Sequence, residues 1–141
     1  MGRFSYLLPK VSNKVIKEIV REQEDYIKDL NREQMYNEGA MDVDNPQKLK
    51  YAQSTIQQKK KRARYKKTDF ITLRWMGDFY DSLKVLIFDK YFVVSSDSTI
   101  WARFLEPQDR FSKALGLTDD SKEKLQVKLT DRMIRWLKTR R

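Results

Sequence analysis

The hydrophobic positions toward both ends of the chain follow helical spacing. Between residues 13 and 35, apolar side chains recur every three or four positions, which predicts an amphipathic helix capped by Ser12 or Asn13. A second stripe follows Thr118, whose hydroxyl can cap a helix, and Asp119 and Asp120 suit the positive N-terminal end of that helix. Both stripes have a charged opposite face, so each helix is expected to bury one side.

The pattern changes in the middle of the chain to two short runs that are typical of strands. Residues 84–88 and 91–95 are β-branched and aromatic, and Asp89-Lys90 between them is a plausible turn. We therefore expect a β-hairpin. Both of its faces are apolar, so it should be covered on both sides by helices or by other subunits. After it, residues 99–105 fit a strand or a helical turn, and their four-residue spacing favours the helix.

Three further elements complete the prediction. Asn45-Pro46 resembles a cap followed by proline at the first helical position, which predicts a helix over residues 46–60. The densest apolar stretch, residues 70–83, contains Gly77, and Asp78 is the expected N-cap of a short helix there. Residues 110–115 are expected to form a short helix that ends at Gly116.

These elements predict an α+β fold, mainly helical, with a long N-terminal helix, a central β-hairpin or small antiparallel sheet, and a C-terminal helix. Residues 1–69 would hold an N-terminal arm, the amphipathic helix, the second helix and a basic loop. Residues 70–141 would hold the hairpin and helices of the core. With 141 residues, the two parts fit one structural domain. Residues 1–11 are either a frayed terminus or an arm whose four large apolar residues dock on the domain or a neighbour: Phe4, Tyr6, Leu7 and Leu8.

The amino-acid composition excludes several classes of functional site and indicates a class of partner. The chain has 30 Lys and Arg against 20 Asp and Glu, a net charge of +10, which favours a polyanionic partner or an acidic assembly surface. It has no cysteine and no histidine, so it offers no disulfide, no thiolate zinc site and no histidine base. No phosphate-binding loop motif or metal-ligand spacing occurs. We expect a non-enzymatic protein without a cofactor or a metal.

No apolar run approaches the ~18 residues of a membrane span, and no signal peptide is evident, so we expect no membrane contact and a cytoplasmic site of synthesis.

The most basic stretch is residues 59–67, where seven of nine side chains are Lys or Arg. It can be a solvated loop, a strip that contacts phosphates without sequence specificity, or a contact to an acidic surface of another subunit. Basic residues also crowd the end of the last helix. The candidate contacts to nucleic acid or an acidic surface are Lys59, Lys60, Lys61, Arg62, Arg64, Lys66, Lys67, Arg135, Arg140 and Arg141. Aromatic residues in and before the hairpin suit a core or a subunit contact, and the candidates for the latter are Trp75, Phe79, Tyr80, Tyr91 and Phe92.

Two short motifs carry a resemblance to a known group of proteins. One is a Leu-x-x-[small]-Gly-x-[apolar]-x-x-Ser-[apolar] segment that precedes a hairpin, and the other is Gly-Leu-Thr followed by a C-terminal helix. The second is residues 116–118, and the first is matched here by Leu73, Gly77, Phe79, Ser82 and Leu83. Through these motifs, residues 70–137 resemble small virion proteins of tailed bacteriophages that form the head–tail connector, the tail-completion ring or the neck. Met76 departs from the pattern, since the residue before the glycine is usually small.

The resemblance implies a structural protein with no catalytic site. It would be a homo-oligomer, a cyclic ring assembled in the host cytoplasm and incorporated into the virion. Its partners would be portal, connector or tail proteins, and packaged double-stranded DNA would pass through the ring. The alternative is a small basic protein that binds nucleic acid without sequence specificity, which rests on the net charge and on residues 59–67.

Overall fold

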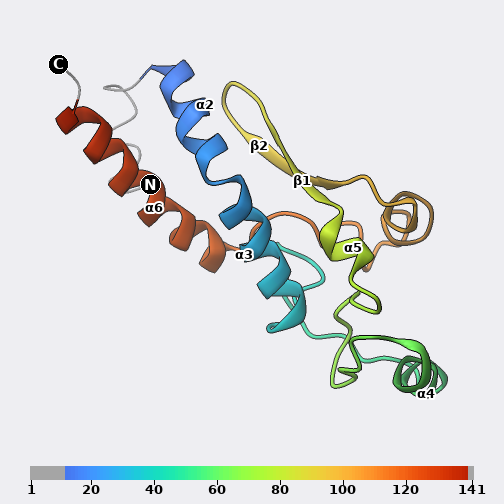
Figure 1. Cartoon of the computed structure of the whole chain (residues 1–141). Coiled ribbons are helices and arrows are strands. Elements are labelled where there is room, and N and C mark those ends of the chain that lie inside the picture. Colours follow the sequence, from blue (N-terminus) through green and yellow to red (C-terminus); the bar gives the residue numbers. More distant parts are fainter. Residues whose placement is uncertain (1–11, 140–141) are drawn as a thin grey trace.

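The computed structural model describes residues 12–139, and the arm predicted within residues 1–11 lies outside this range. The chain forms a mainly helical α+β fold with a two-stranded antiparallel sheet and a long C-terminal helix, as predicted (Figure 1). Its elements are α2 (Asn13–Glu22), α3 (Glu24–Tyr36), α4 (Gln53–Arg62), α5 (Asp78–Asp81), β1 (Leu83–Ile87), β2 (Phe92–Ser96), the π-helix η2 (Trp101–Leu105) and α6 (Asp119–Thr139).

The predicted N-terminal helix is two helices, α2 and α3, that meet at Gln23. The Ser12 hydroxyl caps α2 by accepting from the Val15 N–H at 3.3 Å. At Gln23 the backbone leaves the helical region for one residue, and α3 then continues the same apolar stripe. Ile19 and Ile27 on this stripe are fully buried, and both helices pack against α6. The amphipathic pattern therefore predicted the buried face, although not the break.

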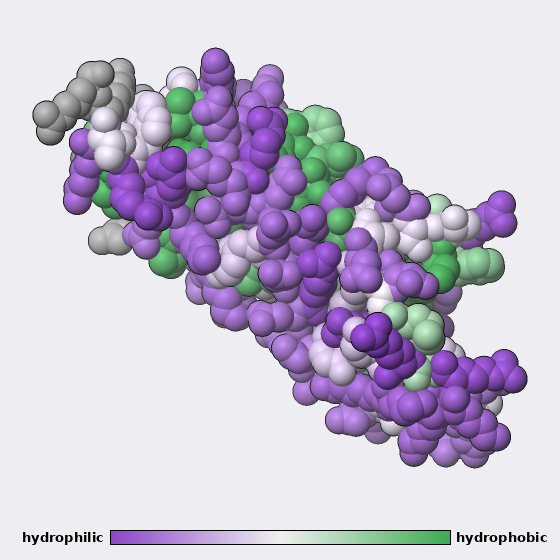
Figure 2. All heavy atoms as spheres, in the orientation of Figure 1, coloured by the Kyte–Doolittle hydropathy of each residue, from purple (hydrophilic) through white to green (hydrophobic). Residues whose placement is uncertain are grey.

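The β-hairpin has the predicted turn and a continuous register from Leu83↔Ser96 to Ile87↔Phe92. The Phe88 N–H donates to the Tyr91 carbonyl at 2.8 Å, which closes the loop around Asp89-Lys90. One face packs against the helices. The other face is not covered within residues 12–139, so its predicted cover by other subunits stays a prediction, and Figure 2 shows apolar side chains at the surface over the hairpin.

Three local predictions were wrong. Residues 46–52 are extended and pair with a later segment, since the Ile71 N–H donates to the Leu49 carbonyl at 2.7 Å, so the helix begins only at Gln53. Gly77, with φ +98°, holds the N-cap position of α5, and Asp78 is the first helical residue. Residues 110–115 form successive turns, held by short-range hydrogen bonds, rather than a helix. Residues 99–105 are helical, as the four-residue spacing favoured.

Two hydrophobic clusters form the core, and each draws on both parts of the chain. The first joins α2, α3 and α6 to the covered face of the hairpin. The second surrounds the α5 segment and combines Met35 and Met41 with Phe79, Tyr80 and Trp101. Residues before and after position 70 therefore share one core, and no boundary between them separates two independent packing units in the described chain.

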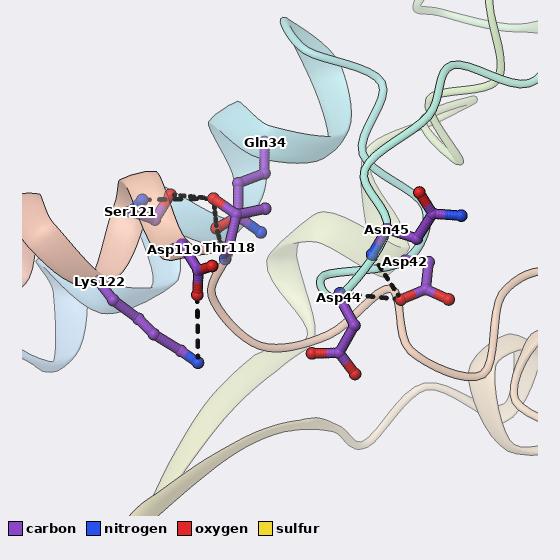
Figure 3. Close-up of polar contacts among 8 residues, drawn as sticks. All are labelled: Gln34, Asp42, Asp44, Asn45, Thr118, Asp119, Ser121 and Lys122. Carbon is purple, nitrogen blue, oxygen red and sulfur yellow. Dashed lines mark hydrogen bonds and ion pairs between the residues drawn. The ribbon is translucent and has the colours of Figure 1, made fainter.

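Buried polar groups fasten α3 to the start of α6. The Gln34 side chain accepts from the Thr118 N–H at 2.9 Å, and the Thr118 hydroxyl in turn accepts from the Ser121 N–H at 3.3 Å (Figure 3). Next to them, the Asn31 amide donates to the Ala114 carbonyl at 3.0 Å and accepts from the Gly116 N–H at 2.9 Å. The bonds of Asn31 and Gln34 cross more than eighty positions of sequence and satisfy groups that would be costly to bury unpaired.

Candidate polyanion interface

Residues 45–68, here called the basic lobe, contain α4 and no acidic side chain. The flanking acids are Asp44 and Asp69, and between them the sequence has nine cations, namely Lys48, Lys50, Lys59, Lys60, Lys61, Arg62, Arg64, Lys66 and Lys67. The lobe lies at one end of the molecule, away from the start of α2 and the end of α6 (Figure 1). Hydrophilic side chains dominate this end in the space-filling view (Figure 2).

Lys59 is not at the surface, so its prediction as a contact residue was wrong. It lies in the last turns of α4 and is fully buried. Its Nζ donates to the Lys67 carbonyl at 2.6 Å, to the Tyr51 hydroxyl at 3.1 Å and to the Thr72 hydroxyl at 3.2 Å. Three oxygen atoms thus replace the water that a buried ammonium loses. Lys59 joins α4 to the segments on either side of it.

The neighbours of Lys59 face solvent. Lys60, Lys61, Arg62, Arg64 and Lys66 are exposed. Residues 59–62 are helical rather than part of a loop, and the Lys66 Nζ donates to the Lys60 carbonyl at 2.6 Å, which folds the end of the run against the helix. Within residues 12–139, no Asp or Glu forms an ion pair with a cation of the lobe.

An alternating series of cations and aromatic rings holds the lobe against the rest of the fold. Tyr36 from α3 lies beside both Lys67 and Arg74, and the Arg74 guanidinium lies 3.8 Å from the centre of the Tyr65 ring. Each such contact contributes roughly 0.5–2 kcal/mol, depending on its exposure. The full series, here called the cation–aromatic ladder, runs Lys48, Phe70, Lys67, Tyr36, Arg74, Tyr65 and Arg64. Sequence patterns missed it because its rings come from three separate segments.

Tyr80 contacts Arg74 of the cation–aromatic ladder. Its ring centre is 4.9 Å from the Arg74 guanidinium, and its hydroxyl donates to the Thr72 carbonyl at 2.5 Å. Burial raises the pKa of Tyr80 well above its usual range, and the positive charge of Arg74 offsets only part of that effect. Tyr80 is therefore a structural, neutral group at any physiological pH.

The predicted subunit contacts fall into two sets. Phe79 and Tyr80 are 5% and 1% exposed in the second cluster, so they are core residues and their prediction as subunit contacts was wrong. Trp75 and Phe92 are half-buried, whereas Tyr91 is 62% exposed and stacks on Phe88 with 4.8 Å between ring centres. The uncovered side of the hairpin, here called the apolar hairpin face, consists of Leu86, Phe88, Tyr91 and Val93.

The basic residues near the C-terminus do not join the lobe. Arg135 is exposed near the end of α6, at the opposite end of the molecule from α4 (Figure 1). Arg140 and Arg141 lie outside the described residues. Among the described residues, the predicted cations therefore belong to two separate surfaces, and the basic lobe is the one that brings several of them together.

No protein-family model, no curated protein and no solved structure matches this chain. Across residues 12–139, no helix combines the length and the apolar character needed to cross a bilayer, and no group of three or more carboxylates is placed to hold a metal ion. The chemistry available at the basic lobe is the contact of fixed, solvent-facing cations with a polyanion.

Proposed function

We propose that this chain is a structural protein of a tailed-phage virion and forms part of the ring of the head–tail connector, the neck or the tail-completion complex. The observation that carries the proposal is the apolar hairpin face. Leu86 and Val93 are 40% and 42% exposed on a strand pair whose other side is packed, and Phe88 and Tyr91 extend the patch to the turn. A contiguous apolar patch of this kind marks a protein contact. In a closed ring, each subunit covers this patch on its neighbour.

Residues of the two phage-like motifs fix the elements around that patch, which supports the proposal. Gly77 starts α5 with a left-handed backbone. The Ser82 hydroxyl lies 2.6 Å from the Ser96 hydroxyl and donates to the Phe79 carbonyl, so it joins α5 to β2. At the second motif, Leu117 is buried in the first cluster and the residue after it caps α6. These contacts support a structural role for the motif residues.

The basic lobe would face the DNA that passes through such a ring. Cations that contact phosphates position a protein on nucleic acid without reading its sequence, which is the interaction a passage for DNA requires. The absence of acidic side chains between positions 44 and 69 favours this orientation, because no local carboxylate competes for the cations.

Purified particles provide the direct test. The protein should be present in washed virions by mass spectrometry and should lie at the portal vertex in an electron-microscopy reconstruction. In solution, Leu86→Glu combined with Val93→Glu should convert rings to monomers, because two charges on the contact patch lose their solvation on assembly. The matched control is Val127→Glu, on an exposed α6 position away from the hairpin. Virions that lack the protein would contradict the proposal, as would equal assembly of both variants.

A second candidate function, binding of nucleic acid without sequence specificity outside a virion, is favoured by the basic lobe itself. Affinity for duplex DNA should fall as salt rises, with a slope of about −0.9 for each phosphate contact. Replacing Lys60, Lys61 and Arg62 by Ser should reduce that slope by about 2–3, since each change removes one cation. The control removes the same charge elsewhere by replacing Lys14, Arg135 and Lys138 with Ser. If both triple variants lower the slope equally, net charge rather than the lobe determines binding.

A further inference from the structure

Arg74 is held by three tyrosine rings rather than by a carboxylate. Its guanidinium carbon lies 3.8 Å from the ring centre of Tyr65, 4.9 Å from that of Tyr80 and 5.0 Å from that of Tyr36. The Tyr36 ring stands nearly perpendicular to the other two, at 78° to Tyr65 and 87° to Tyr80. The three rings, here called the tyrosine box, therefore contact the guanidinium from more than one direction. Planar guanidinium groups favour such positions on aromatic rings.

The nitrogen atoms of the Arg74 side chain have no hydrogen-bond acceptor among residues 12–139. The Nε atom is buried without a hydrogen bond, and no Asp or Glu in this range forms an ion pair with the guanidinium. The residue as a whole is only half-buried, and its two Nη groups are neither hydrogen-bonded within this range nor buried. A buried unpaired donor is rare in folded proteins and calls for an explanation. The rings thus hold a charged group whose two outer nitrogens can still bind an anion.

A second cation lies next to this group. The Lys67 Nζ is 5.2 Å from the centre of the Tyr36 ring, and the Arg74 guanidinium is 5.0 Å from the same centre, so the two charges are at most about 10 Å apart. Lys67 is half-buried and forms no ion pair within residues 12–139. One strand of duplex DNA carries a phosphate for about every 3.4 Å of helix axis. Two cations at this separation can therefore contact phosphates of the same strand.

We propose that Arg74 and Lys67 form a phosphate site and that its ligand is the phosphodiester backbone of DNA. Because Nε is buried, a phosphate would approach Arg74 end-on and accept from both Nη groups, while Lys67 contacts the same phosphate or the next one. The tyrosine box holds the guanidinium before the ligand arrives, so little side-chain freedom is lost on binding. The site rests on the proposed contact of the basic lobe with DNA, and it adds an anchor, Arg74, that lies outside the lobe.

Replacing Arg74 by Lys in the full chain tests the site, because the charge stays and the planar fork is lost. Affinity for a short duplex DNA at low salt should fall about tenfold, the effect of losing one hydrogen bond to a charged group. The matched control is Arg62→Lys, the same change at an exposed position of α4, and it should alter the affinity by no more than about twofold. Equal affinities of the two variants would overturn the proposal.

A second measurement uses the native chain and therefore does not depend on the folding of a variant. Burial of the Arg74 Nε–H slows its exchange with water, so it should give an NMR signal that can be assigned from the Arg74 backbone. The signal should shift and saturate when the same duplex is added, and it should not shift when sodium chloride is added to equal ionic strength. An unchanged signal would overturn the proposal. A shift with a poly-glutamate peptide and none with DNA would also overturn it, in favour of an acidic protein partner.

Failure of this site can be distinguished from failure of the proposed function. A native chain that binds no duplex DNA at low salt would overturn both the site and the orientation of the basic lobe toward DNA. If the Ser variant of Lys60, Lys61 and Arg62 lost affinity while Arg74→Lys bound DNA as tightly as the native chain, the site alone would be overturned.

Discussion

Replacing the buried Lys59 by Met tests whether this side chain anchors the basic lobe. Methionine has a similar length and fills the same space, but it removes the nitrogen that donates to three oxygens. Two of these oxygens keep other donors, since the Tyr51 hydroxyl accepts from the Thr72 N–H and the Thr72 hydroxyl accepts from the Arg74 N–H. The Lys67 carbonyl is thus the group that loses its donor.

The expected loss in the free energy of unfolding follows from the hydrogen bonds that Lys59→Met removes. A buried carbonyl left without a donor costs about 1–3 kcal/mol, and the lost bonds from a charged group add to it. Placing Met in the same space offsets part of the loss, because the ammonium no longer has to be desolvated. We therefore expect Lys59→Met to lower the free energy of unfolding by about 2 kcal/mol. For a chain of this size, that corresponds to a fall in the melting temperature of roughly 4–8 °C.

Urea unfolding followed by circular dichroism measures this difference, with Lys60→Met as the matched control. Lys60 is the next residue of α4 and is exposed, so its replacement should change the free energy of unfolding by no more than about 0.5 kcal/mol. The reasoning would be refuted if both variants unfolded at the same urea concentration. A lower midpoint with an unchanged slope would assign the loss to the folded state.

Three further changes test other parts of the structure. Gly77→Val should cost about 1–3 kcal/mol, because it places a branched residue at φ +98° with its Cβ 3.2 Å from the Tyr65 ring. Asn31→Leu should cost about 2–4 kcal/mol, since it removes two buried hydrogen bonds, whereas Asn37→Leu at an exposed position should be nearly neutral. Tyr80→Phe should make stability less sensitive to alkali. Burial raises the pKa of Tyr80 in the folded chain, so the native protein loses up to about 1.4 kcal/mol per pH unit above the unfolded value near pH 10.

Each of these is measured as a difference in the free energy of unfolding from the native protein. A Gly77→Val chain as stable as the native one would mean that the left-handed turn is not required. Equal costs at Asn31 and Asn37 would mean that the buried amide contributes no more than a surface one. For Tyr80→Phe, the comparison is made between pH 9 and pH 11, and parallel losses in both proteins would assign the alkaline instability to other groups.

The sequence predicted those elements whose residues interact locally. The apolar stripes of α2, α3 and α6, the hairpin with its turn and the Thr118 cap depend on neighbours within a few positions. The start of α4 could not be predicted in this way. The Leu49 carbonyl accepts a hydrogen bond from the Ile71 N–H, so residues 46–52 stay extended although Asn45-Pro46 is a good local helix start.

Of the candidate site, the sequence predicts the concentration of positive charge but not which of the cations are exposed. The run of charge at residues 59–67 is evident in the sequence, and most of its side chains are exposed. Lys59 differs from Lys60 and Lys61 only through its position on α4, which points it at oxygens from residues 51, 67 and 72. No local pattern distinguishes three consecutive lysines, so the buried one is identified only when distant segments are brought together.

The hydrogen bonds of Lys59 fix the basic lobe to the rest of the fold, and this affects how the two ends of the molecule are held. The same frame carries the basic lobe at one end and the hairpin toward the other (Figure 1). Partners bound at these two surfaces would be held at a fixed separation and a fixed angle. The chain would then act as a rigid spacer between them. In the proposed ring, that separation would set the inner radius of the assembly, and replacing the buried Lys59 would test this without changing a solvent-facing side chain of the lobe or the hairpin.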